Sequence, residues 1–174
     1  MNSLEILKAL RQLHVGHAGV YPADRVPRVW TRSTAIVANT DDHNRPGEHW
    51  IAFFLDKHGT ATYFDSYGLP PLDPRFRLRL RRNSIIHRWN DKKLQGTFSQ
   101  SCGQYCCVFL YYMCRGYELN QFLTLFTDNC EHNDKLILQL FRKIFLRRKK
   151  KKRENTCAIC CHVQTCTFKC NRNK

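Results

Sequence analysis

The chain has 174 residues, a length that supports one hydrophobic core, so we expect one domain with a tail. Its 43% hydrophobic content is normal for a globular protein, and no apolar run approaches the roughly 20 residues of a membrane-spanning helix. The N-terminal segment has no basic flank before a long apolar run, so we expect no secretory signal and no membrane association. The net charge of +15 indicates either a polyanionic partner, above all nucleic acid, or a solvated basic face.

The first predicted element is a helix with Ser3 as its N-cap. Two sets of apolar residues recur at helical spacing and could form its buried stripe: Leu4, Leu7, Leu10 and Leu13, or Ile6 and Leu10. Gly16 and Gly19 end this helix, and the proline-punctuated residues 20–29 form a connection. A short strand over Ser33–Asn39 and a turn-rich loop over residues 40–48 follow.

Two central strands are predicted next, over His49–Asp56 and Thr60–Ser66, with a tight turn at residues 57–59. The first of them is apolar almost throughout, which indicates burial on both faces. If the two strands are antiparallel about this turn, His49 lies opposite Ser66 and beside Asp65.

The middle of the chain reads as a short helix over Arg75–Arg82, with Asp73 as N-cap and Pro74 at the first helical position, although its alternation would also suit an edge strand. Strands are predicted over Ser84–Trp89 and Lys92–Gln95. The remaining predicted elements are three helices, over Cys102–Arg115, Glu118–Phe126 and Asn133–Leu146. This order of helices and strands is typical of the α+β class.

Cysteine usage separates the two halves of the chain, because all ten cysteines lie in the last 73 residues. Adjacent cysteines within a helix, such as Cys106-Cys107, do not resemble a secreted disulfide framework, so we expect an intracellular protein with reduced thiols. Cys102 stands out because it opens a helix that must be buried. Unpaired N–H groups and the helix dipole favour a thiolate there, although a lone cysteine is more often structural.

Three upstream residues give Cys102 a chemical context. A carboxylate at Asp65 could orient the imidazole of His49, and a histidine of this kind activates a thiol for acyl transfer. Gln95 lies seven residues before Cys102, where its side-chain amide and the Cys102 backbone N–H could receive the negative charge of an oxyanion. Trp50, next to His49, is either a wall of the active-site groove or a core aromatic.

The segments GEHWIAF, YFDSYG, LRRNS and QGTFSQSCGQYCCVFL resemble the adenain family of cysteine proteases, which includes the adenovirus protease and its relatives in Maverick/Polinton-type transposons. The resemblance covers about residues 15–146. It implies a small central mixed sheet flanked by helices, with the nucleophile at the N-terminus of a buried core helix. It also implies a general base at His49, an orienting acid at Asp65, a nucleophile at Cys102 and an oxyanion hole from Gln95 and Cys102.

The resemblance predicts a monomeric cysteine endopeptidase that processes capsid or core precursor proteins of a virus or transposon, at glycine-containing sites. One alternative is a protease that processes ubiquitin-like proteins, since the SUMO proteases share this residue order. They generally place the glutamine one residue closer to the nucleophile, and they share the aspartate at Asp65 where adenain has glutamate. The other alternative is a catalytically inactive nucleic-acid-binding protein.

The resemblance leaves two activators open. Adenain uses DNA and a peptide that is tethered through a disulfide to a cysteine ahead of the nucleophile, but this chain has no cysteine before Cys102. Basic residues available for DNA cluster between Arg75 and Lys93: Arg75, Arg77, Arg79, Arg81, Arg82, Arg88, Lys92 and Lys93. We expect no metal in the protease domain.

The last predicted division is between a protease domain, residues 1–146, and a tail, residues 147–174, expected to be disordered. Residues 147–153 (RRKKKKR) are a helix end, a nuclear address or a phosphate-binding arm, and we favour entry to the host nucleus together with nucleic-acid contact, with the virion as a further location. Four cysteines behind them could hold one zinc, but their spacing is shorter than in paired zinc modules: Cys157, Cys160, Cys166 and Cys170.

Overall fold

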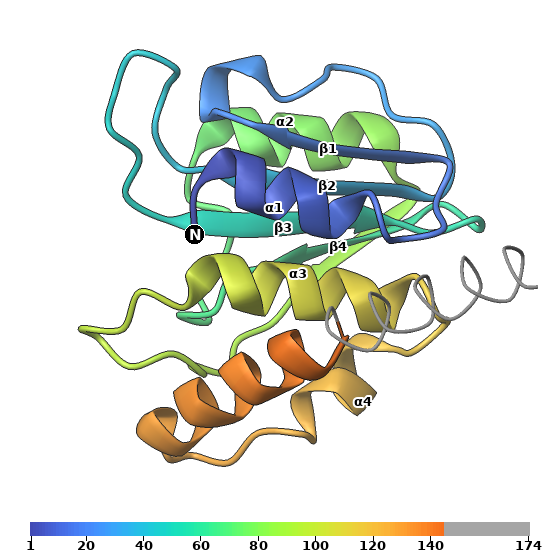
Figure 1. The fold of residues 1–174 in the computed structure, drawn as a ribbon. Helices are drawn as coiled ribbons and strands as arrows, with labels where there is room; N and C mark the ends of the chain where they lie inside the picture. Colours follow the sequence, from blue (N-terminus) through green and yellow to red (C-terminus); the bar gives the residue numbers. More distant parts are fainter. Residues whose placement is uncertain (145–174) are drawn as a thin grey trace, which may run out of the picture.

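The computed structural model of the chain describes residues 1–144, which form a mixed five-stranded sheet between two helical layers (Figure 1). The strands lie in sequence order across the sheet: β1 (His17–Tyr21), β2 (Thr34–Asn39), β3 (Trp50–Leu55), β4 (Thr60–Phe64) and β5 (Ile86–Trp89). The outer pairs, β1 with β2 and β4 with β5, are parallel, and β3 is antiparallel to both of its neighbours. The predicted α+β class with a mixed sheet is confirmed.

The sheet is buried on both faces because its strands are apolar at odd and even positions alike. Four helices belong to the core on one face: α1 (Ser3–Leu10), α3 (Cys102–Met113), α4 (Leu119–Leu123) and the helix of residues 130–144. The other face packs against α2 (Pro74–Asn83) and the connection around the 3-10 helix η1 (Ala23–Arg25). This face has its own hydrophobic core, in which the rings of Phe53 and Phe76 lie 5.4 Å apart between centroids.

Helix α3 is the central element of the first core, and nine of its residues are buried. Its sequence is apolar nearly all round, as expected for a helix enclosed by other elements. Phe109 stacks on Phe64 of β4 with ring centroids 4.5 Å apart. Gly103, in the first turn, allows the close approach of α1, since a Cβ there would lie 3.1 Å from Met1 and 3.3 Å from Ile6.

Three local predictions are corrected by the structure. The N-cap of α1 is Asn2, which forms a capping box with Glu5, so Ser3 is already helical and the buried stripe contains Ile6 and Leu10 while Leu4 is exposed. Residues 17–21, predicted to lie in the connection between the first helix and strand, form β1. Residues 92–95 form no strand, because the N–H groups of the last two bind only the carbonyl of Ser66.

The remaining predicted elements form within a few residues of their predicted bounds. The Arg75–Arg82 segment is helical rather than an edge strand, and Asp73 caps it as predicted. None of the helices within residues 1–144 combines the length and apolar character needed to cross a membrane. The tail predicted over residues 147–174, with its basic run and terminal cysteines, lies outside the described residues, as does the end of the last predicted helix.

Candidate active site

His49 and Asp65 meet at the end of the sheet where β3 begins and β4 ends. The Nε2 atom of His49 lies 2.9 Å from Oδ1 of Asp65, and both side chains are largely buried. Ala52 pairs with Phe64, a register that places His49 opposite Tyr67, one residue beyond the predicted Ser66. The imidazole nevertheless reaches Asp65 and packs on the Tyr67 ring, 4.8 Å between centroids.

Asp65 is held from several sides by groups that the sequence did not point to. Its Oδ1 accepts the backbone N–H of Tyr67 at 2.8 Å. The side chain of Asn90, 1% exposed, accepts the backbone N–H of Asp65 at 2.9 Å and donates to its carbonyl at 2.6 Å. Because these two bonds join Asn90 to the backbone of Asp65, they fix the backbone position from which the Asp65 carboxylate points to the imidazole.

Cys102 and His49 line the same cavity, and each shifts the pKa of the other. Asp65 occupies the Nε2 atom of the His49 ring. Cys102 opens α3, whose N-cap residue makes no side-chain capping bond, so the positive end of the helix dipole faces the sulfur. The imidazole thus lies between a carboxylate and a thiol, in the order that acyl-transfer chemistry requires.

The protonation states follow from these contacts. Burial alone would raise the pKa of the Cys102 thiol, but hydrogen bonds from His49 and the Trp50 backbone, with the His49 charge, lower it below its ordinary value. Burial likewise opposes a charge on His49, yet hydrogen bonds with Asp65 and Cys102 raise the pKa of His49 to about 9. Opposite shifts in two touching groups favour a thiolate–imidazolium pair.

The other thiols of α3 show that this effect is local. Cys106 and Cys107 are fully buried, and burial raises the pKa of both thiols far above the ordinary value. Cys114, at the far end of the helix, has its pKa raised by burial to about 12. These cysteines therefore stay protonated, and Cys106 and Cys107 act as packing residues of the core.

Gln95 lies beside Cys102 in the same cavity and is 1% exposed. Its Oε1 accepts the hydroxyl of Ser66 at 2.6 Å, and its Nε2 donates to the carbonyl of Ser99 at 2.7 Å. These two partners fix the orientation of the amide, since only the NH₂ end can bind a carbonyl. The second N–H of Nε2 points to the hydroxyl of Tyr67 at 3.5 Å. This distance is too long for a strong hydrogen bond, so the N–H is available to another acceptor.

The cavity at this end of the sheet has a volume of about 520 Å³. Its wall contains His49, Cys102 and Gln95, together with Trp50 and Tyr67. The Trp50 side chain is half-buried and its indole donates to the carbonyl of Met1 at 3.1 Å, so it is both a wall of the cavity and tied to the N-terminal segment. His49, Gln95 and Cys102 of the predicted set therefore open to one accessible space, with Asp65 behind His49.

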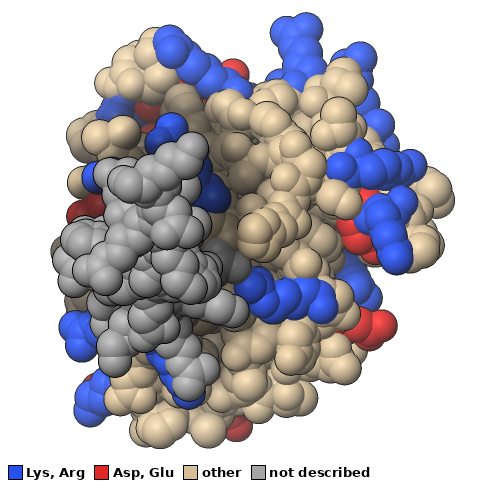
Figure 2. Space-filling view, turned by 45° about the vertical axis from the view of Figure 1, so that its right-hand side comes forward, with Lys and Arg blue, Asp and Glu red and all other residues tan. Residues whose placement is uncertain are grey.

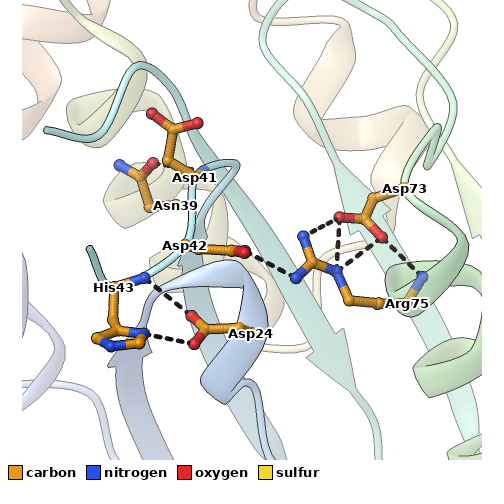
Figure 3. Close-up of polar contacts among 7 residues, drawn as sticks. All are labelled: Asp24, Asn39, Asp41, Asp42, His43, Asp73 and Arg75. Atoms are coloured by element: carbon orange, nitrogen blue, oxygen red, sulfur yellow. Dashed lines mark hydrogen bonds and ion pairs between the residues drawn. The ribbon is translucent and has the colours of Figure 1, made fainter. Parts of the chain in front are cut away.

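The loop that leads into His49 is held by charges on its far side (Figure 3). Asp42 accepts from the guanidinium of Arg75 at 2.7 Å, and the same guanidinium binds Asp73. His43 pairs with Asp24 at 2.7 Å. Gly47 and Glu48 of this loop line the cavity, so these surface pairs help to shape its mouth.

The eight basic residues singled out for DNA come from α2, β5 and the segment after β5, and several of them already have polar partners. Arg75 is engaged with two carboxylates, and Arg77 donates to the carbonyl of Leu72 at 2.9 Å. The other contacts are distributed over separate parts of the fold: Arg88 lies on β5 near Thr62, Lys92 binds the carbonyl of Phe126 and Asp128, and Lys93 binds Thr97. A role of these eight residues in nucleic-acid binding stays a prediction.

A smaller basic cluster forms where α2 meets the connection before β2. Arg79 donates to the carbonyl of Val26 at 3.2 Å and Asn83 to that of Arg28 at 3.1 Å, so the connection with Arg28 lies against α2. Burial lowers the pKa of Arg79, and the positive charges of Arg28, Arg82 and Arg75 lower it further. Arg81 and Arg82 are exposed on α2. Figure 2 shows Lys and Arg side chains projecting from the upper and right-hand edges of the molecule, with few acidic side chains among them. Arg28 was not singled out from the sequence.

The four C-terminal cysteines that could hold a zinc ion lie outside the described residues: Cys157, Cys160, Cys166 and Cys170. Within residues 1–144, no group of three or more His, Cys, Asp or Glu side chains is arranged to hold a metal ion.

Comparisons with known proteins place similar sequences among viral proteases. The chain is 34% identical over 92 residues to a protein of Acanthamoeba polyphaga mimivirus named as a thiol protease, covering 47% of this chain and 30% of the relative. It is 30% identical over 97 residues to the protease of Human adenovirus A serotype 12, covering 46% of each chain. No protein-family model matches the chain. The crystal structure of an ASFV protease matches with 25% identity and a TM-score of 0.43, covering 63% of this chain and 44% of that one.

The predicted resemblance to adenain-like cysteine proteases is thus confirmed at the level of sequence similarity. The chain spans less than half the length of either of these relatives. The activity of these full-length relatives is therefore assigned to this protein only as a proposal.

Proposed function

We propose that the chain is a cysteine endopeptidase of the adenain type. The observation that carries this proposal is the contact series Asp65–His49–Cys102, with the thiol at the start of α3 and open to a cavity. Similarity to two viral proteases supports the same activity. The residues singled out from the sequence as base, orienting acid and nucleophile supply each group that thiol-mediated acyl transfer needs.

The reaction begins with attack of the Cys102 thiolate on the carbonyl carbon of a peptide bond. The imidazolium of His49 then donates its proton to the leaving amine as the C–N bond breaks, which leaves a thioester on Cys102. Neutral His49 next takes a proton from water, and the hydroxide formed in that step attacks the thioester. The carboxylic acid product leaves, and the thiolate–imidazolium pair returns.

Negative charge develops on the substrate oxygen in both steps, and two donors are available for it. One is the backbone N–H of Cys102, and the other is the second N–H of the Gln95 amide nitrogen, whose only partner within residues 1–144 besides Ser99 is the Tyr67 hydroxyl at 3.5 Å. Donors that are already oriented before reaction lower the barrier without reorganisation. The bonds of Gln95 to Ser66 and Ser99 supply that orientation.

The substrate that we propose is a structural precursor protein, cut beside a glycine. Two bulky side chains, Trp50 and Tyr67, line the cavity next to His49, which leaves more room for a residue without a side chain than for a branched one. The predicted resemblance supports the same preference, since adenain-like proteases act at glycine-containing sites in capsid and core precursors.

A peptide-profiling experiment tests this function. The full chain is incubated with a mixture of peptides of varied sequence, with and without double-stranded DNA, and the products are read by mass spectrometry. We expect cleavage at glycine-containing sites and modification of Cys102 by a peptide vinyl sulfone. The DNA arm shows whether a polyanion activates the enzyme.

Two outcomes would redirect the proposal. Cleavage of ubiquitin-like C-terminal fusions, with no cleavage of glycine-containing capsid-type peptides, would favour the ubiquitin-like-protein processing alternative. Folded protein that cleaves nothing and leaves Cys102 unmodified by the vinyl sulfone would contradict an enzymatic function.

Nucleic-acid contact is proposed as a second property, based on the cluster of Arg28, Arg79 and Arg82. Each guanidinium that neutralises a phosphate releases a counterion, so binding weakens as salt rises. Replacing Arg79 and Arg82 with alanine is expected to weaken DNA binding and to reduce the slope of log affinity against log salt by about 2. Fluorescence anisotropy with duplex DNA over a salt series measures both quantities.

The matched control removes two other positive charges, Arg142 and Lys143, which are exposed on the helix of residues 130–144. Equal affinities and salt slopes for the two double variants would show that binding follows net charge alone, and the cluster on α2 would lose its role.

A further inference from the structure

The loop of residues 95–101 connects the two proposed oxyanion donors, since Gln95 opens it and Cys102 follows it directly. Its tip is not packed, because the Phe98 side chain is 99% exposed. Ser99 and Gln100 line the active-site cavity. The geometry of the oxyanion hole therefore depends on what holds the two ends of this loop.

Both ends of the loop are bound by one carboxylate, that of Asp134 on the helix of residues 130–144. Its Oδ2 accepts the backbone N–H of Gly96 at 3.1 Å, and its Oδ1 accepts the hydroxyl of Ser101 at 2.8 Å. Ser101 also contacts the hydroxyl of Ser99 at 2.6 Å. The carboxylate thus bridges the residue after Gln95 and the residue before Cys102.

The helix that carries Asp134 is itself fixed to the same region. The neighbouring Asn133 is fully buried and donates to the carbonyls of Leu94, at 3.3 Å, and Thr127, at 2.9 Å. Leu94 directly precedes Gln95, so the helix start is anchored to both sides of the glutamine. The ion pairs within residues 1–144 do not include Asp134. Besides its bonds to the loop, Asp134 faces the Tyr105 hydroxyl, whose pKa is raised by burial and by this carboxylate.

The bond to Ser101 also affects α3. Serine at an N-cap normally accepts an N–H of the first helical turn with its own hydroxyl oxygen. Here the hydroxyl donates to Asp134, and Ser101 makes no capping bond. The first-turn N–H groups therefore keep no side-chain partner at the cap, next to the sulfur and the place where the oxyanion forms.

We infer that Asp134 is a positioning residue for the oxyanion hole. It sets the spacing between Gln95 and Cys102 and keeps Ser101 from capping α3. This inference rests on the proposed peptidase function. Misplacement of a catalytic group by about 1 Å lowers a rate by roughly 100-fold, so loss of this bridge should affect turnover more than substrate binding.

The test uses Asp134→Asn and Ser101→Ala in the full chain, with Asp128→Asn as the control, since the side chain of Asp128 is fully exposed. An asparagine has one acceptor oxygen, so it cannot accept from both Gly96 and Ser101 as the carboxylate does, and the hydroxyl of Ser101 has to turn. For Asp134→Asn we expect kcat to fall about 30-fold with KM little changed. The rate and pH profile of Cys102 alkylation by iodoacetamide should stay as in the parent, because His49 and Asp65 are untouched.

Ser101→Ala should lower kcat less than Asp134→Asn does. Adding Ser101→Ala to Asp134→Asn should have little further effect on kcat.

Hydrogen exchange separates this inference from the proposed function. Faster exchange of the amides of residues 95–101 in Asp134→Asn, and not in Asp128→Asn, would support the positioning role even if no peptide were cleaved. Unchanged exchange and unchanged kcat in Asp134→Asn would overturn it. Loss of Cys102 alkylation in step with cleavage would also overturn it, because it would show general disruption of the site.

Discussion

Replacement of Cys102 with serine is expected to lower the rate of peptide cleavage by about a million-fold, as removal of a nucleophile does in proteases with a comparable triad. A hydroxyl ionises far less readily than a thiol, so the ion pair with His49 cannot form in the variant. The oxygen fits the space of the sulfur, and the fold and the melting temperature should change little. Labelling of this position by a vinyl sulfone should be lost together with cleavage.

The matched control is Cys114→Ser, at the other end of the same helix. Cys114 is half-buried, away from the catalytic cavity, and its raised pKa keeps it protonated. This variant should cleave at the parental rate. Parental cleavage by Cys102→Ser, with the fold intact, would remove the assignment of the nucleophile.

Local sequence patterns predicted the elements that form the centre of the fold. β3 is apolar throughout and is buried, and the Asp73-Pro74 pair starts α2 as its chemistry requires. β1 was missed because its residues are only partly buried at an edge and include a glycine, so no alternation marks them. It exists because Val20 and its neighbours pair with β2, a contact that no local pattern records.

Residue type and order predicted the four central residues of the candidate site but not the residues that support them. His49, Asp65, Gln95 and Cys102 were found because acyl transfer needs these residue types, and a turn of known length brings the first two together. Their supports were not found, since Asn90 resembles an ordinary turn residue in the Asn-Asp pair before Lys92. Its bonds to Asp65 span 25 positions in the sequence.

The loop support was missed for the same reason. Asp134 lies in a predicted helix with an apolar stripe, where an acid reads as a solvated residue. Its contact with Gly96 spans 38 positions and depends on how the last helix docks beside α3. Supporting residues of this kind are determined by tertiary packing and not by a motif.

Replacement of His49 with alanine is expected to lower cleavage about 10,000-fold, because the thiolate loses its counter-ion and the leaving amine loses its proton donor. The same change should shift the pH dependence of Cys102 alkylation. In the parent chain the hydrogen bond and charge of His49 lower the pKa of the Cys102 thiol, against the effect of burial. Without them burial dominates, and alkylation should begin at higher pH.

The pH profile of the parent enzyme follows from the signs of the two shifts. Cleavage should fall at acid pH as the pH passes down through the lowered pKa of Cys102, where the thiolate is protonated. It should also fall at alkaline pH as the pH rises through about 9, where His49 loses the proton that it donates to the amine. Asp65→Asn should move the alkaline limb to lower pH, because the carboxylate is what raises the pKa of His49 against burial. An alkaline limb that stays in place in Asp65→Asn would show that the carboxylate does not stabilise the imidazolium, and His49 would then need another source for its proton affinity.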